Sequence, residues 1–197
     1  MNKIVALVTG GFTGESVVSM KSSAFVESQI DRTKYVVYKI VILKEGWYYE
    51  DQNTVKHPVD LNDFSIKPKD TKINFDVVFI MIHGSPGEDG KLQGYFDLLG
   101  IPYTSCDALT SSLTMNKGYS KAIVDGIPRL HIAKSVQLFE NSHESSGLLL
   151  NSLKLPLFIK PNNGGSSIGM SKVKSSEELP AALDKAFRED TQVLVEE

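Results

Sequence analysis

Three glycine-rich segments hold the side chains that could do chemistry, and each follows an apolar run that predicts a buried strand. The first segment, residues 10–15, contains three glycines and ends at Glu15. Glycines between a strand and a helix let a ligand approach the backbone at the helix N-terminus. Glu15 could therefore bind a cationic group such as an ammonium, although an acid at this place could also merely complement the helix dipole.

The second segment, residues 83–90, begins with His83 and contains three glycines and a proline. A histidine at the start of such a tight loop could bind a carboxylate. The alternative is an ordinary turn in which Glu88 and Asp89 cap the next helix. Ligands of open α/β sheets bind beyond the carboxyl ends of the strands, so the first two segments are expected to face the same crevice.

The third segment, residues 160–169, starts with Lys160 and continues through glycines and serines. Backbone N–H groups and hydroxyls in such a loop bind phosphate oxygens, and the lysine adds positive charge. It is not a Walker A sequence, which places its lysine after the glycines, and a plain hairpin turn is the alternative. Lys117 could be a second phosphate-binding lysine, although by itself it also fits a solvated helix residue.

The elements that must position these segments alternate between strands and helices. A helix begins at Ser16, and Val17, Met20 and Ala24 share one of its faces. The polar residues 50–72 predict a surface excursion. Strands are predicted at residues 4–8, 35–43, 47–49 and 77–82, and a further helix at 92–99. This order predicts an open, mainly parallel α/β domain over residues 1–105.

A second, α+β domain is predicted over residues 106–197. Its expected elements are helices within 107–125, strands at 132–139, 157–160 and 170–173, helices at 148–153 and from 175 to 187, and a strand at 193–195. Ser175 and Glu178 form the pattern of a capping box. The last strand has no closing helix after it, which predicts either an edge strand or a piece of a longer protein.

Composition narrows the class of protein. Apolar residues make up 41% of the 197 residues, as in soluble globular domains. The net charge of −3 favours neither nucleic acid nor an acidic membrane as a partner. No apolar run approaches about 18 residues, and residues 4–8 are too short for a signal peptide. The single cysteine, Cys106, excludes an intramolecular disulfide and fits a reducing cytosol.

Taken together, these segments resemble the D-alanine–D-alanine ligase family, which belongs to the ATP-grasp enzymes. The matching stretches occur in family order at residues 10–19, 83–90, 92–94, 100–104, 115–117 and 160–170. The resemblance implies a Rossmann-like, pre-ATP-grasp domain at the N-terminus, followed by the first lobe of an ATP-grasp fold. The C-terminal ATP-grasp lobe of the family is absent from these residues.

The resemblance also implies roles for single residues. Glu15 is expected to hold and orient the first D-alanine, Val18 to pack on its methyl group, and His83 to contact its carboxylate. Ser166 is expected to be linked to Glu15, so that both are candidate catalytic residues. The residues expected to bind ATP are Lys117, Lys160, Gly165, Ser166, Ser167, Glu196 and Glu197, the last two at the start of the adenine-binding hinge. Asn116 departs from the family, which commonly has aspartate there.

The reaction implied is ATP-dependent ligation of two D-alanine molecules. The first carboxylate attacks the γ-phosphate to give an acylphosphate, and the amine of the second alanine displaces phosphate. The product would feed peptidoglycan synthesis in a bacterial cytoplasm, and the enzyme would be a homodimer. The Mg²⁺ ligands and the transition-state arginine of the family lie in the region absent here. The 197-residue chain by itself is therefore expected to lack turnover.

Two other interpretations remain open. The chain could belong to another ATP-grasp carboxylate–amine ligase or to a D-alanine–D-lactate ligase, because the selecting residues lie in the absent region. It could also be a non-catalytic binding fragment. A dehydrogenase is disfavoured, because the dinucleotide-binding fingerprint is lacking.

Overall fold

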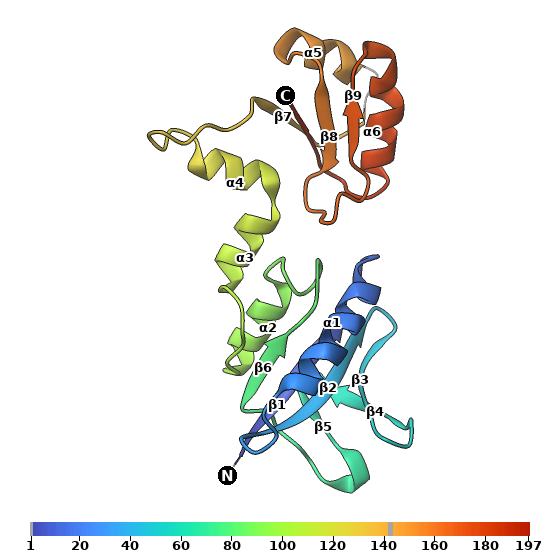
Figure 1. Cartoon of the computed structure of the whole chain (residues 1–197), viewed down its shortest axis with the longest axis vertical. Coiled ribbons are helices and arrows are strands. Elements are labelled where there is room, and N and C mark those ends of the chain that lie inside the picture. Colours follow the sequence, from blue (N-terminus) through green and yellow to red (C-terminus); the bar gives the residue numbers. More distant parts are fainter. Residues whose placement is uncertain (1, 142–143) are drawn as a thin grey trace. The chain divides into compact units, whose positions relative to one another are not determined.

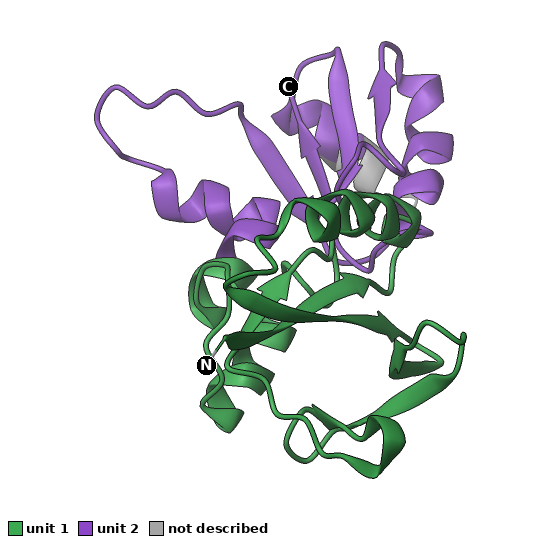
Figure 2. Cartoon of the chain, turned by 60° about the horizontal axis from the view of Figure 1, so that its bottom comes forward, with its two compact units in different colours: residues 1–112 green, residues 113–197 purple. Residues whose placement is uncertain are grey.

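The computed structural model of the chain describes residues 2–141 and 144–197 (Figure 1). The structure divides into two compact units, residues 1–112 and residues 113–197 (Figure 2). Each unit has its own sheet and its own hydrophobic core.

The first unit is built on a six-stranded sheet in the order β5-β4-β3-β2-β1-β6. Its elements are β1 (Lys3–Gly10), α1 (Ser16–Gln29), β2 (Tyr35–Leu43), β3 (Gly46–Glu50), β4 (Lys56–Asp60), β5 (Ser65–Ile66), β6 (Val77–Ile80) and α2 (Lys91–Leu99). β1 pairs in parallel with β2 and β6, and the strands from β2 to β5 pair antiparallel. The expected α/β sheet is confirmed, and it carries an antiparallel extension because the chain doubles back through short turns after β2.

β1 is covered on both faces, which explains why its sequence is a continuous apolar run. Val8 belongs to the core to which α2 contributes Phe96. On the other face, Thr9 Oγ1 lies 3.0 Å from Ser19 Oγ of α1, the helix that lies over β1 in Figure 1. The carboxyl end of β1 is therefore held between two helices.

α1 buries two serines and exposes several apolar side chains. Ser19 and Ser23 are fully buried, whereas Val17 is 61% and Phe25 70% exposed. The face shared by Val17, Met20 and Ala24 is therefore not the one that packs on the sheet. Small hydroxyl side chains suit this contact because they bring the helix close to the strands and form hydrogen bonds there.

Residues 50–72 are ordered into β4, β5 and a 3-10 turn at Pro68–Asp70, so the prediction of a mere surface excursion is wrong. Val59 pairs with Ile66 across β4 and β5, and both are buried. Phe64 is 0% exposed, and its ring centroid lies 4.8 Å from that of Phe96. A few apolar side chains are enough to order a polar segment when all of them pack into one core. Composition alone does not reveal where such side chains pack.

The second unit contains a four-stranded antiparallel sheet in the order β7-β10-β8-β9. Its elements, with the helix that leads into it, are α3 (Ala108–Met115), α4 (Lys117–Val124), β7 (Ser135–Leu138), α5 (Glu144–Ser152), β8 (Leu157–Pro161), β9 (Ser171–Val173), α6 (Leu179–Phe187) and β10 (Val193–Glu196). β10 pairs with both β7 and β8, so the interpretation of the last strand as an edge strand is wrong. β7 is shorter than predicted, and α5 begins at Glu144, earlier than the expected residue 148.

Alternation along β8 and β10 gives this sheet two different faces. Ile159 and Val195 belong to the core beneath the helices, to which α6 contributes Leu183. The side chains that alternate with them, including Lys160 and Glu196, belong to the opposite face. The polar candidate residues of these strands therefore share one face.

The N-termini of α4 and α6 are stabilised by different hydrogen bonds. Asn116 is the N-cap of α4, and its Oδ1 accepts a hydrogen bond of 2.9 Å from Tyr119 N, as an aspartate would. The capping box expected at Ser175 is wrong, because Glu178 Oε2 accepts instead from Lys174 N, at 2.9 Å, and a 3-10 turn precedes α6. No helix within the described ranges of either unit is both long and apolar enough to cross a membrane.

We predict that Phe64→Ala destabilises the first unit by about 3–5 kcal/mol, because it removes a large, fully buried ring. The chain's one tryptophan, Trp47, reports on this unit, since its ring centroid lies 6.2 Å from that of Phe64. Urea unfolding followed by tryptophan fluorescence measures the change. The matched control, Phe25→Ala on the exposed face of α1, should stay within about 0.5 kcal/mol of wild type. Equal losses in the two variants would contradict this account of the core.

Candidate functional site

The candidate residues of the first unit lie at the carboxyl ends of β1 and β6, which are neighbours in the sheet. Phe12 N donates a hydrogen bond of 2.8 Å to Ser85 O, and Gly11 N donates one of 2.8 Å to Ile42 O. The loops after β1 and β6 are therefore side by side, as the parallel arrangement of these strands predicts.

Glu15 reaches the second of these loops. Its Oε2 lies 2.9 Å from the position that a Cβ on Gly84 would occupy, and Gly84 has a φ of +69°. A larger residue at Gly84 would displace this carboxylate, and the positive φ disfavours any residue other than glycine there. Glu15 occupies the N-cap position of α1 without a side-chain capping bond, so its carboxylate is directed to the loop beside His83.

His83 and Val18 complete the first group. His83 is half-buried at the start of its loop, directly before the glycine that Glu15 approaches. Val18 is 53% exposed, and its backbone N–H donates to Glu15 O at 2.9 Å. An acid, an imidazole and an apolar side chain thus come from two adjacent loops and the first turn of α1.

Two buried hydroxyls hold the base of this group. Ser19 Oγ donates to Met81 O at 2.7 Å and accepts from Gly10 N at 3.0 Å. It also lies 3.0 Å from Thr9 Oγ1. Ser19 therefore ties α1 to the ends of both β1 and β6, and it sets where Glu15 begins the helix. We did not predict this role, because a serine among apolar residues gives no sign of the strand ends beneath it.

The loop of residues 83–90 is closed by its own side chains. Glu88 Oε2 accepts from Gly84 N at 2.6 Å, so Glu88 shapes the loop and does not cap the next helix. Asp89 Oδ1 accepts from Lys91 N at 3.3 Å, but the N-cap of α2 is Gly90, which has no side-chain capping bond, so the capping alternative for Asp89 is wrong. From α2, the fully buried Gln93 donates to Gly87 O at 2.6 Å.

In the second unit, five of the seven predicted ATP-binding residues line one cavity of about 210 Å³. The residues that line it are Lys117, Lys160, Pro161, Gly164, Gly165, Ser166, Ser167, Ile168 and Met170. Two lysines and a serine–glycine loop therefore surround one small space, which is the combination that phosphate oxygens require.

Lys117 is held at the first position of α4. Its Nζ donates to Pro161 O at 3.1 Å, to Asn162 O at 3.2 Å, and also to Gly164 O. The alternative of a solvated helix residue is therefore wrong. The three carbonyl oxygens hold the ammonium at the edge of the glycine-rich loop.

The glycine-rich loop contains two consecutive residues in the left-handed region, Ser166 with a φ of 48° and Ser167 with a φ of 58°. Each costs roughly 1–2 kcal/mol, and such residues cluster at ligand-binding loops. The turns around them are closed by Ile168 N donating to Gly165 O at 3.1 Å and by Met170 N donating to Ser167 O at 3.2 Å. Both serines are exposed.

Asn162 joins this loop to α4. Its fully buried side chain accepts from Gly118 N at 2.8 Å and donates to Gln192 Oε1 at 2.9 Å. A Cβ at Gly118 would lie 2.2 Å from Gln137 Oε1, so a larger residue there would displace the Gln137 side chain. Asn162 thus docks the helix that carries Lys117 onto the end of β8. In the sequence it is only one polar residue in a loop, so its role could not be recognised.

The two glutamates at the end of the chain behave differently. Glu196 binds Lys160 Nζ through Oε1, and Lys121 Nζ at 3.0 Å through Oε2. Burial raises the pKa of Glu196, but the hydrogen bonds and charges of the two lysines outweigh this effect and hold the pKa below its usual value. Glu197 does not line the cavity, and its Oε1 accepts from Lys154 N at 2.9 Å.

Comparison with protein families gives two consecutive matches. The family model described as D-ala D-ala ligase N-terminus matches residues 4–106. The model described as D-ala D-ala ligase C-terminus matches residues 126–197. One match falls in each unit, and residues 107–125 lie between the two matches.

Individual relatives agree with these matches. The chain is 40% identical to a D-alanine–D-alanine ligase of Flavobacterium johnsoniae over 196 residues, which are 98% of this chain and 60% of that protein. It is 41% identical to one of Phocaeicola vulgatus, covering 100% of this chain and 60% of the relative. The chain thus spans about 60% of the length of these curated relatives.

Solved structures share the fold. D-alanyl-alanine synthetase A of Vibrio cholerae matches with a TM-score of 0.88 and 28% identity, over 99% of this chain and 59% of that one. The VanG D-Ala:D-Ser ligase of Enterococcus faecalis matches with a TM-score of 0.85 and 34% identity, over 100% of this chain and 63% of that one. With the first family model covering more than half of its residues, the chain belongs to the D-alanine–D-alanine ligase family.

Proposed function

We propose that the protein containing this chain joins two D-alanine molecules to D-alanyl-D-alanine at the expense of ATP. The observation that carries the proposal is the convergence of Lys117, Lys160 and residues 165–167 on one cavity. Two ammonium groups and a loop of backbone N–H groups and hydroxyls suit the charge of a triphosphate. Family membership names the reaction in which this phosphate site would be used.

The first D-alanine is proposed to bind in the first unit. It is a small zwitterion, so its site needs an acid for the ammonium and a donor for the carboxylate. Glu15 and His83 are of these two types, and the exposed Val18 offers an apolar surface for the methyl group. If these residues orient the D-alanine carboxylate, its attack on the γ-phosphate of bound ATP becomes a reaction between two groups already held in place, which lowers the entropic cost of the step. The roles of Ser166 beside Glu15, and of Glu196 and Glu197 at an adenine-binding hinge, belong to the same proposal.

Mg²⁺ is part of the proposed reaction, since phosphoryl transfer commonly uses metal ions that bridge the β and γ oxygens. Among the side chains that the structure describes, no group of three or more His, Cys, Asp or Glu could hold a metal ion. The described residues therefore do not fit a complete Mg²⁺ site, and we derive no step through the metal.

A second candidate differs only in the second substrate. The 34% identity to a D-Ala:D-Ser ligase favours D-serine as an alternative to D-alanine, and D-lactate is a further one. A ligation assay with ATP, D-alanine and each of D-alanine, D-serine and D-lactate as acceptor distinguishes them. The proposal also includes a bacterial cytoplasmic setting. It further includes a homodimer, and analytical ultracentrifugation would test this oligomeric state.

We predict that Lys160→Ala weakens ATP binding by about 10- to 150-fold, because it removes one charge-assisted contact worth roughly 1.5–3 kcal/mol. Calorimetry measures the dissociation constant. Lys174→Ala is the matched control, since Lys174 is exposed and lies outside the cavity. An unchanged affinity of Lys160→Ala would remove Lys160 from the proposed phosphate site.

We predict that Glu15→Gln raises the KM for the first D-alanine or lowers kcat by about 10- to 150-fold, because it keeps the shape but removes the charge that binds the ammonium. ATP affinity should stay within about twofold, since the contact is not made to the nucleotide. Steady-state kinetics and calorimetry measure the two quantities. Glu45→Gln, at an exposed turn, is the control. Equal losses of D-alanine and ATP binding would instead assign Glu15 a structural role.

A further inference from the structure

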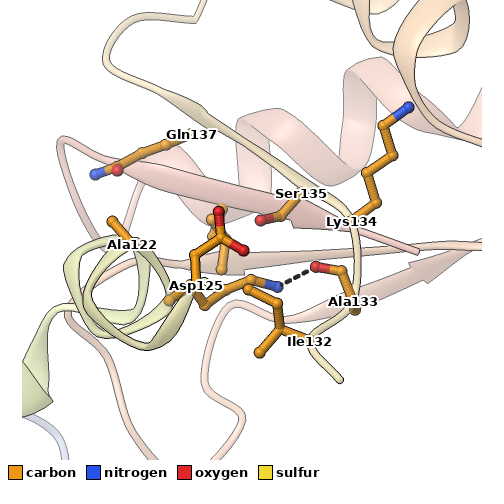
Figure 3. A pocket seen from close by; sticks show the side chains of 10 residues that line it. Ala122, Asp125, Ile132, Ala133, Lys134, Ser135 and Gln137 are labelled. Carbon is orange, nitrogen blue, oxygen red and sulfur yellow. Dashed lines mark hydrogen bonds between the residues drawn. The ribbon is translucent and has the colours of Figure 1, made fainter. Parts of the chain in front are cut away.

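Lys121 is a largely buried charge that the proposed phosphate site does not explain. It lies on α4, one turn after Lys117, and its side chain is only 18% exposed. It lines a cavity of about 500 Å³ between α4 and the segment that leads into β7 (Figure 3). It does not line the smaller cavity that holds Lys117 and Lys160. A lysine buried to this extent needs partners, because desolvation of its ammonium is costly.

Its partners are two acceptors on different parts of the second unit. Lys121 Nζ donates to Ala133 O at 2.7 Å, the bond drawn as a dashed line in Figure 3. It also donates to Glu196 Oε2 at 3.0 Å. The backbone carbonyl fixes the ammonium from one side, so the ammonium can hold the carboxylate in one orientation from the other.

The carboxylate that Lys121 holds is the one that binds Lys160. Glu196 uses its two oxygens separately, Oε1 for Lys160 and Oε2 for Lys121. β8 and β10 are paired so that Leu194 lies opposite Lys160 and Glu196 opposite Phe158, which brings the acid diagonally next to Lys160. With Lys121 removed, both carboxylate oxygens would be free to turn toward Lys160 and compete with phosphate for its ammonium.

We propose that Lys121 is a positioning residue for nucleotide binding: it holds Glu196 so that Glu196 directs the Lys160 ammonium toward the phosphate cavity. This inference rests on the proposed function. It assigns no contact between Lys121 and the nucleotide, because Lys121 lies outside the cavity that would hold the phosphates. The low pKa of Glu196, held down by both lysines against its burial, agrees with a carboxylate that stays charged between them.

The first test is the ATP dissociation constant of Lys121→Met, which keeps the length of the side chain but removes its charge. We expect a roughly tenfold increase, within the range of coupling energies in one ion-pair network. Lys134→Met is the matched control, because Lys134 lines the same cavity and makes no ion pair with Glu196 in the described part of the chain. Figure 3 shows its side chain extending away from Asp125. Lys121→Arg can still bridge a carboxylate and a carbonyl, so its ATP dissociation constant should stay within about threefold of the wild-type value.

The second test repeats the comparison in a Glu196→Gln background. If Lys121 acts through the carboxylate, Lys121→Met should cause less than about a twofold further loss there. A tenfold loss in both backgrounds would overturn the inference, because it would mean that Lys121 attracts the nucleotide directly.

A third measurement needs no nucleotide. NMR titration of the Glu196 carboxyl should show a higher pKa in Lys121→Met than in wild type, because one of the two cations that stabilise the charged form is gone. An unchanged Glu196 pKa would overturn the inference even if ATP affinity fell. A wild-type protein that does not bind ATP would overturn the proposed function and this inference with it. ATP binding by wild type with unchanged affinity in Lys121→Met would overturn this inference alone.

Discussion

The carboxylate of Glu196 between Lys160 and Lys121 is the interaction on which the proposed phosphate site of the second unit depends. The ammonium groups of Lys160 and Lys121 repel each other and lose hydration, so the acid that they share stabilises both. Strand pairing places the acid, since β10 lies between β7 and β8 in the sheet. The inner position of β10 therefore also determines the electrostatics of the site.

Lys117 is held by backbone carbonyls of the same unit. Three carbonyl oxygens receive its ammonium, and Asn162 docks its helix on the end of β8. Lys160 is held differently, because its ammonium binds the Glu196 carboxylate. The two lysines are thus positioned by different contacts, although sequence alone treats them as equivalent.

In the first unit, the loops after β1 and β6 are held mainly by side-chain hydrogen bonds to the backbone. Ser19 and Thr9 form a buried hydroxyl pair beneath the Gly10–Gly11 turn, and Glu88 closes the loop after β6. Hydrogen bonds of this kind are short-ranged and directional, so they set the position of Glu15 relative to Gly84 closely. The apolar face of α1 is left exposed because the helix packs through its serines.

The sequence by itself determined the strands with continuous apolar runs, most of the helices, and the three loops that hold the candidate residues. These follow from local preference and periodicity, which act over a few neighbouring residues. It could not reveal the strands within residues 50–72, the burial of Phe64, or the inner position of the last strand, because each depends on partners far away in the chain. The same limit applies to the site: the candidate residues were recognised by type and motif, whereas Ser19, Asn162 and Lys121 act through contacts that only the tertiary structure creates.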